Sequence, residues 1–332
     1  MPPAIYYICY LPPKTGGELV NLQHVAYLNR LGIRAVALVN ANPSATAHSL
    51  EPGDALYDLP CETLIQGRQF GPDDIVVIPE FYAEAFRHFA TQPCRRVIHN
   101  QGPFLSFRGF ESIAQMNANG LAAGLSCSTF GKNLLLRMGS TLPWQVVTPF
   151  VHPLFHNQQQ DQQQARKLQV AYMPDKRPRE APVIKALLHQ LYPALAAVPW
   201  VPIAGISRRA CAEIMARSAV FASFSWLEGL GLPPLEAMAA GCLVCGFVGH
   251  GGSDFATPGN GMWVAEGDHE GYAHAVAATL EVARAAGPEL ARRSATGHAT
   301  AAGYSRERFT IELEAGWRHI LGERWEHYRL GA

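Results

Sequence analysis

The sequence predicts an α/β protein with two domains, each built from βαβ units around a parallel sheet. Short apolar, β-rich segments alternate with helical patterns along the chain, which is typical of parallel sheets with helical crossovers. A chain of 332 residues exceeds what one hydrophobic core usually covers, so two domains of roughly 150 residues are expected. A polar, glutamine-rich stretch at residues 157–164 interrupts the alternation and marks the predicted hinge.

The first half begins with a strand, a glycine pair and a helix. The helix is expected over residues 18–31, where apolar side chains recur at helical spacing before Gly32 ends it. Gly16 and Gly17 form the predicted turn in front of it, which serves either as a tight connection or as a ligand loop. Strands are expected at residues 5–11, 34–39, 75–79, 96–99, 124–127 and 145–148.

The second half repeats the alternation after the hinge. Strands are expected at residues 168–173, 201–204, 220–224 and 243–247, and helices at 181–191, 208–217 and 271–285. The last thirty residues have helical patterns, and Trp317, Trp325 and Tyr328 need an apolar surface to cover them. The predicted organisation is an N-terminal domain at 1–155, a linker at 156–167, a C-terminal domain at 168–305, and C-terminal helices at 306–332 that pack back toward the N-terminal domain.

Composition excludes several classes of protein. Lys plus Arg and Asp plus Glu both number 27, so a basic face for nucleic acid is not expected. The N-terminus lacks the features of a signal peptide and no apolar run is long enough to span a membrane, so the protein is expected to be cytoplasmic. Seven scattered cysteines favour reduced thiols, and Cys242 and Cys245 lie in an apolar run that favours a core strand over a metal site.

The most informative segment follows the predicted strand at residues 220–224. Glu228 and Glu236 are separated by Gly-Leu-Gly-Leu-Pro-Pro-Leu. Because proline favours the first positions of a helix, a helix is expected to begin near Pro233, after a glycine-bearing loop. Free N–H groups at a helix start favour a phosphate. Glu236 is expected in the first turn, where it can accept hydrogen bonds from vicinal hydroxyls, and Glu228 at the carboxyl edge of the sheet, where ligands bind.

Together these residues resemble the EX7E signature of retaining glycosyltransferases of the GT-B fold, in particular glycosyltransferase family 4. The segment from Thr15 to Glu18 resembles the N-terminal glycine loop of that family, and residues 147–155 resemble the segment that leads into its linker. Residues 249–254 and 266–268 are similar to its late C-domain turns. The resemblance covers most of the chain. It implies two Rossmann-like domains whose parallel sheets face each other across a cleft.

The resemblance also implies roles for the C-terminal residues. Glu236 would hold the ribose of a nucleotide-sugar donor, and Glu228 would meet hydroxyls of the transferred sugar. Lys176 and Arg177 would neutralise the diphosphate, although Tyr172 stands where the family usually has an arginine. The backbone amides of the glycine loop would hold sugar and phosphate; its residues are Gly229, Leu230, Gly231 and Leu232.

In the N-terminal domain a strand leads directly into His99, Asn100 and Gln101. The family often places a histidine near the donor sugar at such a turn, and the sequence leaves open which of the three residues takes this role. No Asp-x-Asp has the context of a metal-bridging site, so cationic side chains are expected to replace a metal. The resemblance implies a hexosyl transfer with retention of configuration. The reaction is expected to need no cofactor and to use a UDP- or GDP-sugar as co-substrate.

Other functions remain open at this point. A nucleotide-sugar epimerase or a phosphorylase could use the same architecture, and a catalytically degenerate protein could bind a nucleotide-sugar without turning it over. A dinucleotide-dependent dehydrogenase is disfavoured because Gly229 and Gly231 lack a third glycine at the required spacing. The sequence does not identify the sugar or the nucleotide. It also does not identify the oligomeric state or the acceptor, which could be a glycan, a lipid-linked group, a protein or a small molecule.

Overall fold

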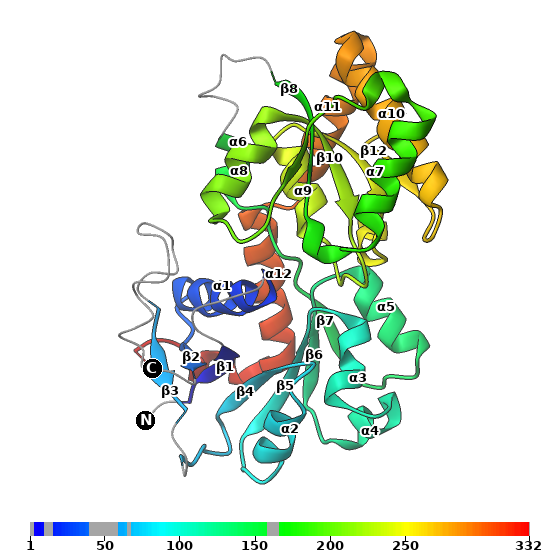
Figure 1. Ribbon diagram of the computed structural model, residues 1–332. Helices are drawn as coiled ribbons and strands as arrows, with labels where there is room; N and C mark the ends of the chain where they lie inside the picture. Colours follow the sequence, from blue (N-terminus) through cyan, green and yellow to red (C-terminus); the bar gives the residue numbers. More distant parts are fainter. Residues whose placement is uncertain (1–2, 10–15, 40–58, 65–67, 158–165, 332) are drawn as a thin grey trace. The chain divides into compact units, whose positions relative to one another are not determined.

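The computed structural model describes residues 3–9, 16–39, 59–64, 68–157 and 166–331. Contacts divide the chain into two compact units, Met1–Pro149 with Phe309–Ala332, and Phe150–Arg308. Each unit has its own parallel sheet and its own core (Figure 1). Thr15 of the predicted glycine loop and residues 158–165 of the predicted linker lie outside the described residues.

Unit 1 contains a seven-stranded sheet in the order β3-β2-β1-β4-β5-β6-β7. All neighbouring strands in it are parallel. The central strands consist almost entirely of apolar residues that are buried, as expected when helices cover both faces of a parallel sheet. The strands are β1 Ile5–Cys9, β2 Ala35–Val39, β3 Cys61–Thr63, β4 Ile75–Pro79, β5 Arg95–Asn100, β6 Ala123–Ser126 and β7 Trp144–Val146.

The helices of unit 1 begin at recognisable caps. Ser112 and Ser128 each accept a hydrogen bond from a backbone N–H in the first turn of the helix that follows, α4 and α5. From Phe309 onward, α12 belongs to unit 1, and Trp317 is fully buried there. The helices are α1 Gly16–Arg30, α2 Ala83–Ala90, α3 Ser106–Gly109, α4 Ile113–Ala118, α5 Thr129–Arg137 and α12 Arg306–Leu321.

Unit 2 contains a five-stranded parallel sheet in the order β12-β11-β10-β8-β9. Helices α7 and α10 contact each other, and α10 packs on β10 and β11. The strands are β8 Lys167–Tyr172, β9 Trp200–Pro202, β10 Ser218–Phe224, β11 Leu243–Phe247 and β12 Gly261–Val264. The helices are α6 Pro153–Asn157, α7 Glu180–Leu191, α8 Arg208–Arg217, α9 Leu232–Ala239, α10 His269–Ala285 and α11 Pro288–Ala302.

The strand orders define a switch point in each sheet. In unit 1 the chain proceeds from β1 to β2 and β3 on one side, and then returns to build β4 to β7 on the other side. In unit 2 it proceeds from β8 to β9 and then returns to place β10 on the other side of β8. Ligands of open parallel sheets bind at the carboxyl ends of the two strands that flank such a point. These strands are β1 and β4 in unit 1 and β8 and β10 in unit 2.

Three details differ from the sequence prediction. Strands β3 and β12 were not predicted; both lie at a sheet edge. Helix α1 begins at Gly16, so Gly16 and Gly17 form its first turn and not a separate turn before it. Unit 2 begins at Phe150, ahead of the predicted linker, because α6 contacts α8 and α9 of that unit.

None of the helices in the described part of the chain has the length and apolar character needed to cross a membrane.

Candidate functional site

The loop after β10 carries Glu228 and is held by the loop after β11. The Glu228 N–H donates to the Gly249 carbonyl at 3.0 Å, and the Gly251 N–H donates to the Glu228 carbonyl at 3.2 Å. Leu227 and His250, which flank these contacts, both have positive φ, 49° and 69°. Non-glycine residues seldom adopt this conformation, so the two loops fix the backbone of Glu228 tightly.

A glycine permits the close approach of the two loops. A Cβ atom at Gly251 would lie 2.2 Å from the Gly229 carbonyl oxygen, a backbone atom that cannot move aside cheaply. The segment from residue 249 to 254, which resembles a late turn of the glycosyltransferase family, therefore supports the glycine loop directly. The two loops follow neighbouring strands, β10 and β11, at the carboxyl edge of the sheet.

Lys176 and Glu228 meet at the switch point of unit 2. The Lys176 Nζ lies 2.6 Å from the Glu228 Oε1, and the two side chains are 40% and 18% exposed. Lys176 lies in the turn after β8 and Glu228 in the loop after β10, so each follows one of the strands that flank the switch point. A cation and a carboxylate that a ligand can reach are thus held together where ligands of this fold class bind.

Arg177, the neighbour of Lys176, has a different environment. Its guanidinium is buried, forms ion pairs with Glu180 and Glu266, and lies over the Phe247 ring with 4.4 Å between the Cζ and the ring centroid. It also donates to the Ser225 carbonyl from Nε and Nη2. Arg177 therefore ties the start of the Glu228 loop to two carboxylates, and most of its donors already have partners.

Helix α9 begins at Leu232, after Gly231 in the left-handed conformation, with φ of 89°. Glu236 is therefore the fifth residue of α9. The prediction that it lies in the first turn is wrong, because the helix starts ahead of the proline pair. Burial, only partly offset by Arg208, raises the pKa of Glu236 to about 7. The carboxyl is thus poorly stabilised in its ionised form until a hydrogen-bond donor reaches it.

In unit 1, His99 and Gln101 share one partner, Asn21 of α1. The Asn21 Oδ1 lies 2.6 Å from the His99 Nδ1 and 2.9 Å from the Gln101 Nε2. A Cβ at Gly17 would lie 2.9 Å from the Gln101 Oε1, so the missing side chain at Gly17 makes room for Gln101. The predicted residues Gly17, His99 and Gln101 are therefore neighbours, whereas no atom of the described residues lies within 4 Å of a Cβ added at Gly16.

Asn100 points away from this cluster, as successive residues of a strand do. Its Nδ2 donates to the Ser106 Oγ at 2.6 Å, and the side chain is fully buried.

Glu80, which the sequence analysis missed, follows β4 at the switch point of unit 1. Burial raises the pKa of its carboxyl to about 7, and the nearby backbone N–H groups of Gln101 and Gly102 lower it only in part. Its position directly after a buried strand was the signal that could have identified it.

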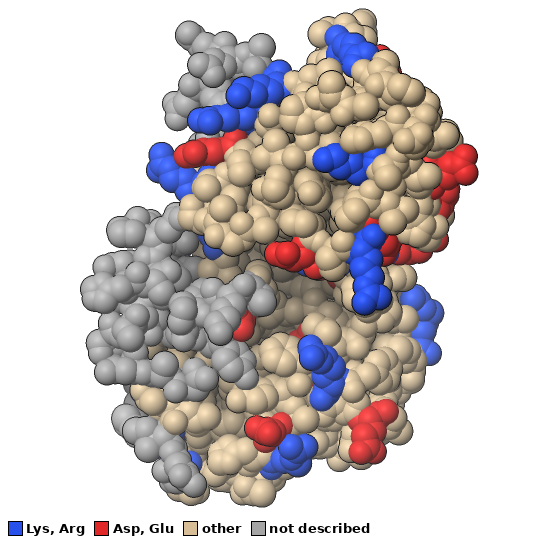
Figure 2. Space-filling view, in the orientation of Figure 1, with Lys and Arg blue, Asp and Glu red and all other residues tan. Residues whose placement is uncertain are grey.

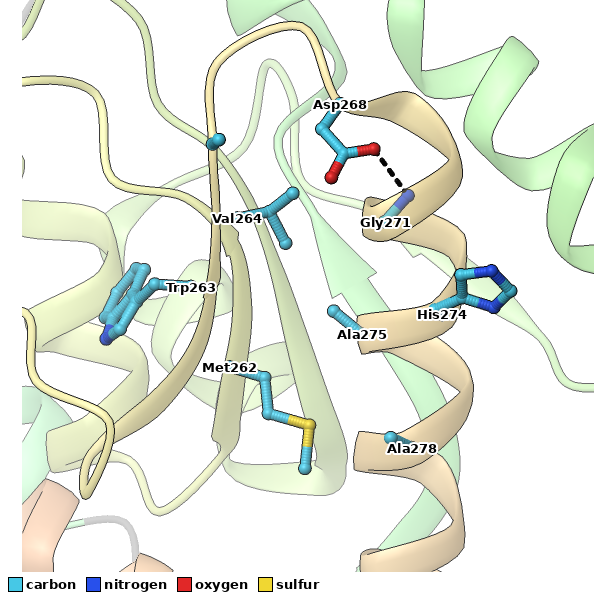
Figure 3. Close-up of a pocket in the computed structure, with 9 residues that line it drawn as sticks. Met262, Trp263, Val264, Asp268, Gly271, His274, Ala275 and Ala278 are labelled. Carbon is cyan, nitrogen blue, oxygen red and sulfur yellow. Dashed lines mark hydrogen bonds between the residues drawn. The ribbon is translucent and has the colours of Figure 1, made fainter.

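A shallow cavity of about 400 Å³ lies between β12 and α10 (Figure 3). Its walls include Met262, Val264 and Ala275, and the Asp268 carboxylate caps α10 by accepting from the Gly271 N–H. None of the residues predicted to bind the donor lines it.

Within the described residues, no three His, Cys, Asp or Glu side chains come together as metal ligands.

On the face shown in Figure 2, basic and acidic side chains are interspersed over each unit. No large patch of one charge is visible on that face of either unit. The charged groups that the site brings together are instead few and specific, namely Lys176 with Glu228 and Arg177 with its carboxylates.

Comparisons with known proteins identify the family. Residues 154–281 match the family described as glycosyl transferases group 1. The chain is also 31% identical over 281 residues to an alpha-1,6-glucosyltransferase of Actinobacillus pleuropneumoniae serotype 7 (strain AP76), with 83% of each chain covered. The chain belongs to the group 1 glycosyl transferases. The matched range, residues 154–281, contains Lys176, Glu228 and Glu236.

Solved structures establish the fold of this group 1 glycosyl transferase. HepE of Anabaena, in complex with UDP-glucose, has a TM-score of 0.68 at 16% identity and matches 95% of this chain and 99% of its own. Sucrose-phosphate synthase of Thermosynechococcus elongatus has a TM-score of 0.65 at 12% identity, with 97% and 100% covered. The prediction of a GT-B fold with two parallel-sheet α/β domains is therefore confirmed.

Proposed function

We propose that this glycosyltransferase transfers glucose from UDP-glucose to a hydroxyl group of an acceptor. The similar proteins support this choice, since one is an alpha-1,6-glucosyltransferase and another is bound to UDP-glucose. Because UDP-glucose is the α-anomer, an α-linked product would require retention of configuration, as in the retaining hexosyltransferases that the EX7E segment resembles.

The donor would bind at the carboxyl edge of the unit 2 sheet. Lys176 would exchange its ion pair with Glu228 for contacts with the diphosphate, which would release the Glu228 carboxylate to accept hydrogen bonds from sugar hydroxyls. The N–H groups of residues 229–232, at the start of α9, would add donors to the same anion. Glu236 would accept hydrogen bonds from the ribose hydroxyls.

Arg177 would act by holding the loop, because its carboxylate and carbonyl partners occupy most of its donors. The negative charge that develops on the departing UDP would be stabilised by Lys176 and by fixed N–H groups, without a metal. Undiminished turnover in the presence of EDTA is the result expected from this assignment.

The observation that carries the proposal is the Lys176–Glu228 pair at the switch point, in front of α9. The test is to measure UDP release from UDP-glucose by the purified protein, with and without candidate acceptors, and to compare GDP-, ADP- and dTDP-glucose. Replacing Lys176 by Met should lower kcat/KM by at least about tenfold, the loss of one charge-assisted contact. The matched control is Lys167→Met, at the amino end of the same strand, which should retain activity.

If Lys176→Met and the wild type turned over UDP-glucose equally, the site would be wrongly assigned. Conversion of UDP-glucose alone to another nucleotide-sugar would instead indicate an epimerase. Phosphate-dependent release of glucose phosphate would indicate a phosphorylase, and donor binding without any turnover would indicate a degenerate binding protein.

A further inference from the structure

Unit 2 carries an exposed apolar surface that the proposed donor site does not use. Within the described part of this unit, the side chains of Val183, Leu191 and Ile206 are 49%, 43% and 43% exposed. Residues 181–207, which contain all three, include one lysine and no arginine, aspartate or glutamate, whereas 16% of the whole chain is charged. An exposed apolar surface with so little charge is typical of an interaction site.

Helix α7 presents these side chains on one side. Val183, Leu187 and Leu191 are four residues apart, so they form a stripe along the helix. The other side of α7 faces α10, because the Tyr192 hydroxyl at the end of α7 lies 2.6 Å from the His274 Nδ1 of α10. The apolar stripe is therefore not covered by α10.

The stripe continues onto the edge of the sheet. Since α10 packs on β10 and β11 and β9 is the strand at the opposite edge, the side of α7 away from α10 lies toward β9. Leu187 and Trp200, the first residue of β9, both pack at the margin of the unit 2 core. Ile206 lies in the connection from β9 to α8. The α7–β9 face, as we call this surface, consists of Val183, Leu187, Leu191, Trp200 and Ile206.

Two prolines limit how a partner can approach the α7–β9 face. Pro199 precedes β9 and Pro202 ends it, and both are exposed. Because proline has no backbone N–H, the outer edge of β9 is a poor template for an added strand. A partner would therefore pack on the side chains of the face and would not extend the sheet.

The α7–β9 face fits an uncharged partner. Lys185 is the charged residue of the segment, and it lies on the α10 side of α7, because it is seven residues before Tyr192. An anionic membrane or a nucleic acid would find too few cations on this face to be attracted to it. The partner surface should be apolar and neutral as well.

A second copy of the chain offers such a surface in its own α7–β9 face. In the described part of unit 1, the exposed side chains of Leu105, Phe107 and Leu136 lie beside Arg108 and Arg137. Against an uncharged face these arginines would lose water without gaining a carboxylate. Two α7–β9 faces can meet without this cost, and copies with 27 basic and 27 acidic residues each do not repel one another.

We propose that two copies of this glycosyltransferase form a two-fold symmetric dimer through their α7–β9 faces. In such a dimer both copies contribute the same surface, so the contact closes on itself and no apolar face is left for further copies. Lys176 and Glu228 are not part of the face, so each copy keeps its own donor site.

The first test is the mass of the purified protein in solution. Light scattering or sedimentation equilibrium should be measured from about 1 μM to about 100 μM, because interfaces of ordinary size have dissociation constants in or below this range. The mass should rise toward twice the 36.2 kDa of one chain. The mass of a single chain throughout this range would overturn the proposal, and binding of that monomer to phosphatidylglycerol vesicles would identify a membrane as the partner instead.

The second test places a charge on the face. Leu191→Glu should raise the Kd of the dimer by at least about a hundredfold, because the contact would bury two carboxylates without partners. The matched control is Leu136→Glu, since Leu136 is 44% exposed on α5 of unit 1. Its Kd should equal that of the wild type. An unchanged Kd in Leu191→Glu would show that the copies meet elsewhere, which would refute the assignment.

A third measurement uses the wild type alone, so it does not depend on whether a variant folds. Amides that become buried in a contact exchange their hydrogens more slowly. Exchange in residues 183–206 should therefore be slower at about 100 μM than at about 1 μM, the two ends of the same concentration range. Exchange in α5 should be equal at both concentrations. Slower exchange in another segment, with residues 183–206 unaffected, would contradict the proposal.

Discussion

Donor affinity should depend on pH through Glu236. Its pKa of about 7 in the unliganded protein means that roughly half of the molecules carry a protonated Glu236 at neutral pH. The proposed role requires the carboxylate, which accepts hydrogen bonds from two ribose hydroxyls. Binding must therefore release a proton from the protonated fraction, and affinity should rise as the pH rises.

The magnitude follows from the pKa. Between pH 8 and pH 6 the ionised fraction of a group with a pKa of about 7 falls by about tenfold. If only the ionised form binds, Kd for UDP-glucose should be about tenfold higher at pH 6, which is about 1.4 kcal/mol. UDP-glucose is the suitable ligand because its diphosphate diester does not titrate in this range, whereas the terminal phosphate of UDP does.

Titration calorimetry at pH 6, 7 and 8, in buffers with different ionisation enthalpies, measures both Kd and the protons released. Glu236→Gln is the matched control, since it keeps the shape of the side chain and removes the titration. It should bind more weakly at pH 8 and with little pH dependence. A full pH dependence in Glu236→Gln would refute the reasoning, and would direct attention to Glu80, whose pKa is also about 7.

The free energy of unfolding should also depend on the ionisation of Glu236, but it should fall with rising pH where donor affinity rises. A carboxyl whose pKa is higher in the folded than in the unfolded state binds more protons when folded, so the free energy of unfolding falls as pH rises from about 4.5 to about 7. Glu236→Gln should therefore be more stable than the wild type at pH 8 although it binds the donor less well. Thermal unfolding without ligand, at pH 5 and pH 8, measures this.

Three further substitutions test the packing of the site. Arg177→Met should lower the free energy of unfolding by about 3 kcal/mol, measured in urea, because it leaves the Ser225 carbonyl and two carboxylates without their buried partner. Gly251→Ala should lower kcat/KM strongly, because its Cβ would push the Gly229 carbonyl away. Gly287→Ala is the control and should retain kcat/KM, because Gly287 has a φ of −97° and the nearest atom to its added Cβ would be 3.9 Å away. Trp317→Phe should cost more than about 1 kcal/mol in denaturant unfolding, because it removes one buried hydrogen bond to Tyr7 and leaves a cavity where the larger ring was fully buried. Unchanged values would contradict each assignment.

The sequence predicted the buried strands better than the edge strands. Strands such as Ile75–Pro79 and Leu243–Phe247 are continuous apolar runs because helices cover both faces, and their predicted bounds match the structure. Strands β3 and β12 have three and four residues and are only partly buried for most of their length. These two segments form strands because a neighbouring strand pairs with them. Their own residues are too few to show a pattern from which a strand could be predicted.

Within the site, the sequence could identify positions but not environments. Lys176 and Arg177 are adjacent, and both were predicted as partners of the diphosphate. The structure turns one side chain toward Glu228 and encloses the other between Glu180, three residues along the chain, and Glu266, which is distant in sequence. For the same reason Asn21 was not predicted, because its significance comes from two residues near position 100 that it meets only in the folded unit.

Two strained residues bear on the role proposed for Glu228. Leu227 and His250 have positive φ without being glycine, which costs of the order of 1 kcal/mol or more each. Both lie beside Glu228, and the Gly249–Glu228–Gly251 hydrogen bonds hold the strained conformation in place. A loop without these strained residues would be more stable, but it would allow Glu228 to move together with Lys176. Since the carboxylate must stay in place when the donor takes Lys176 from it, a fixed backbone at Glu228 is the property that the proposed exchange requires.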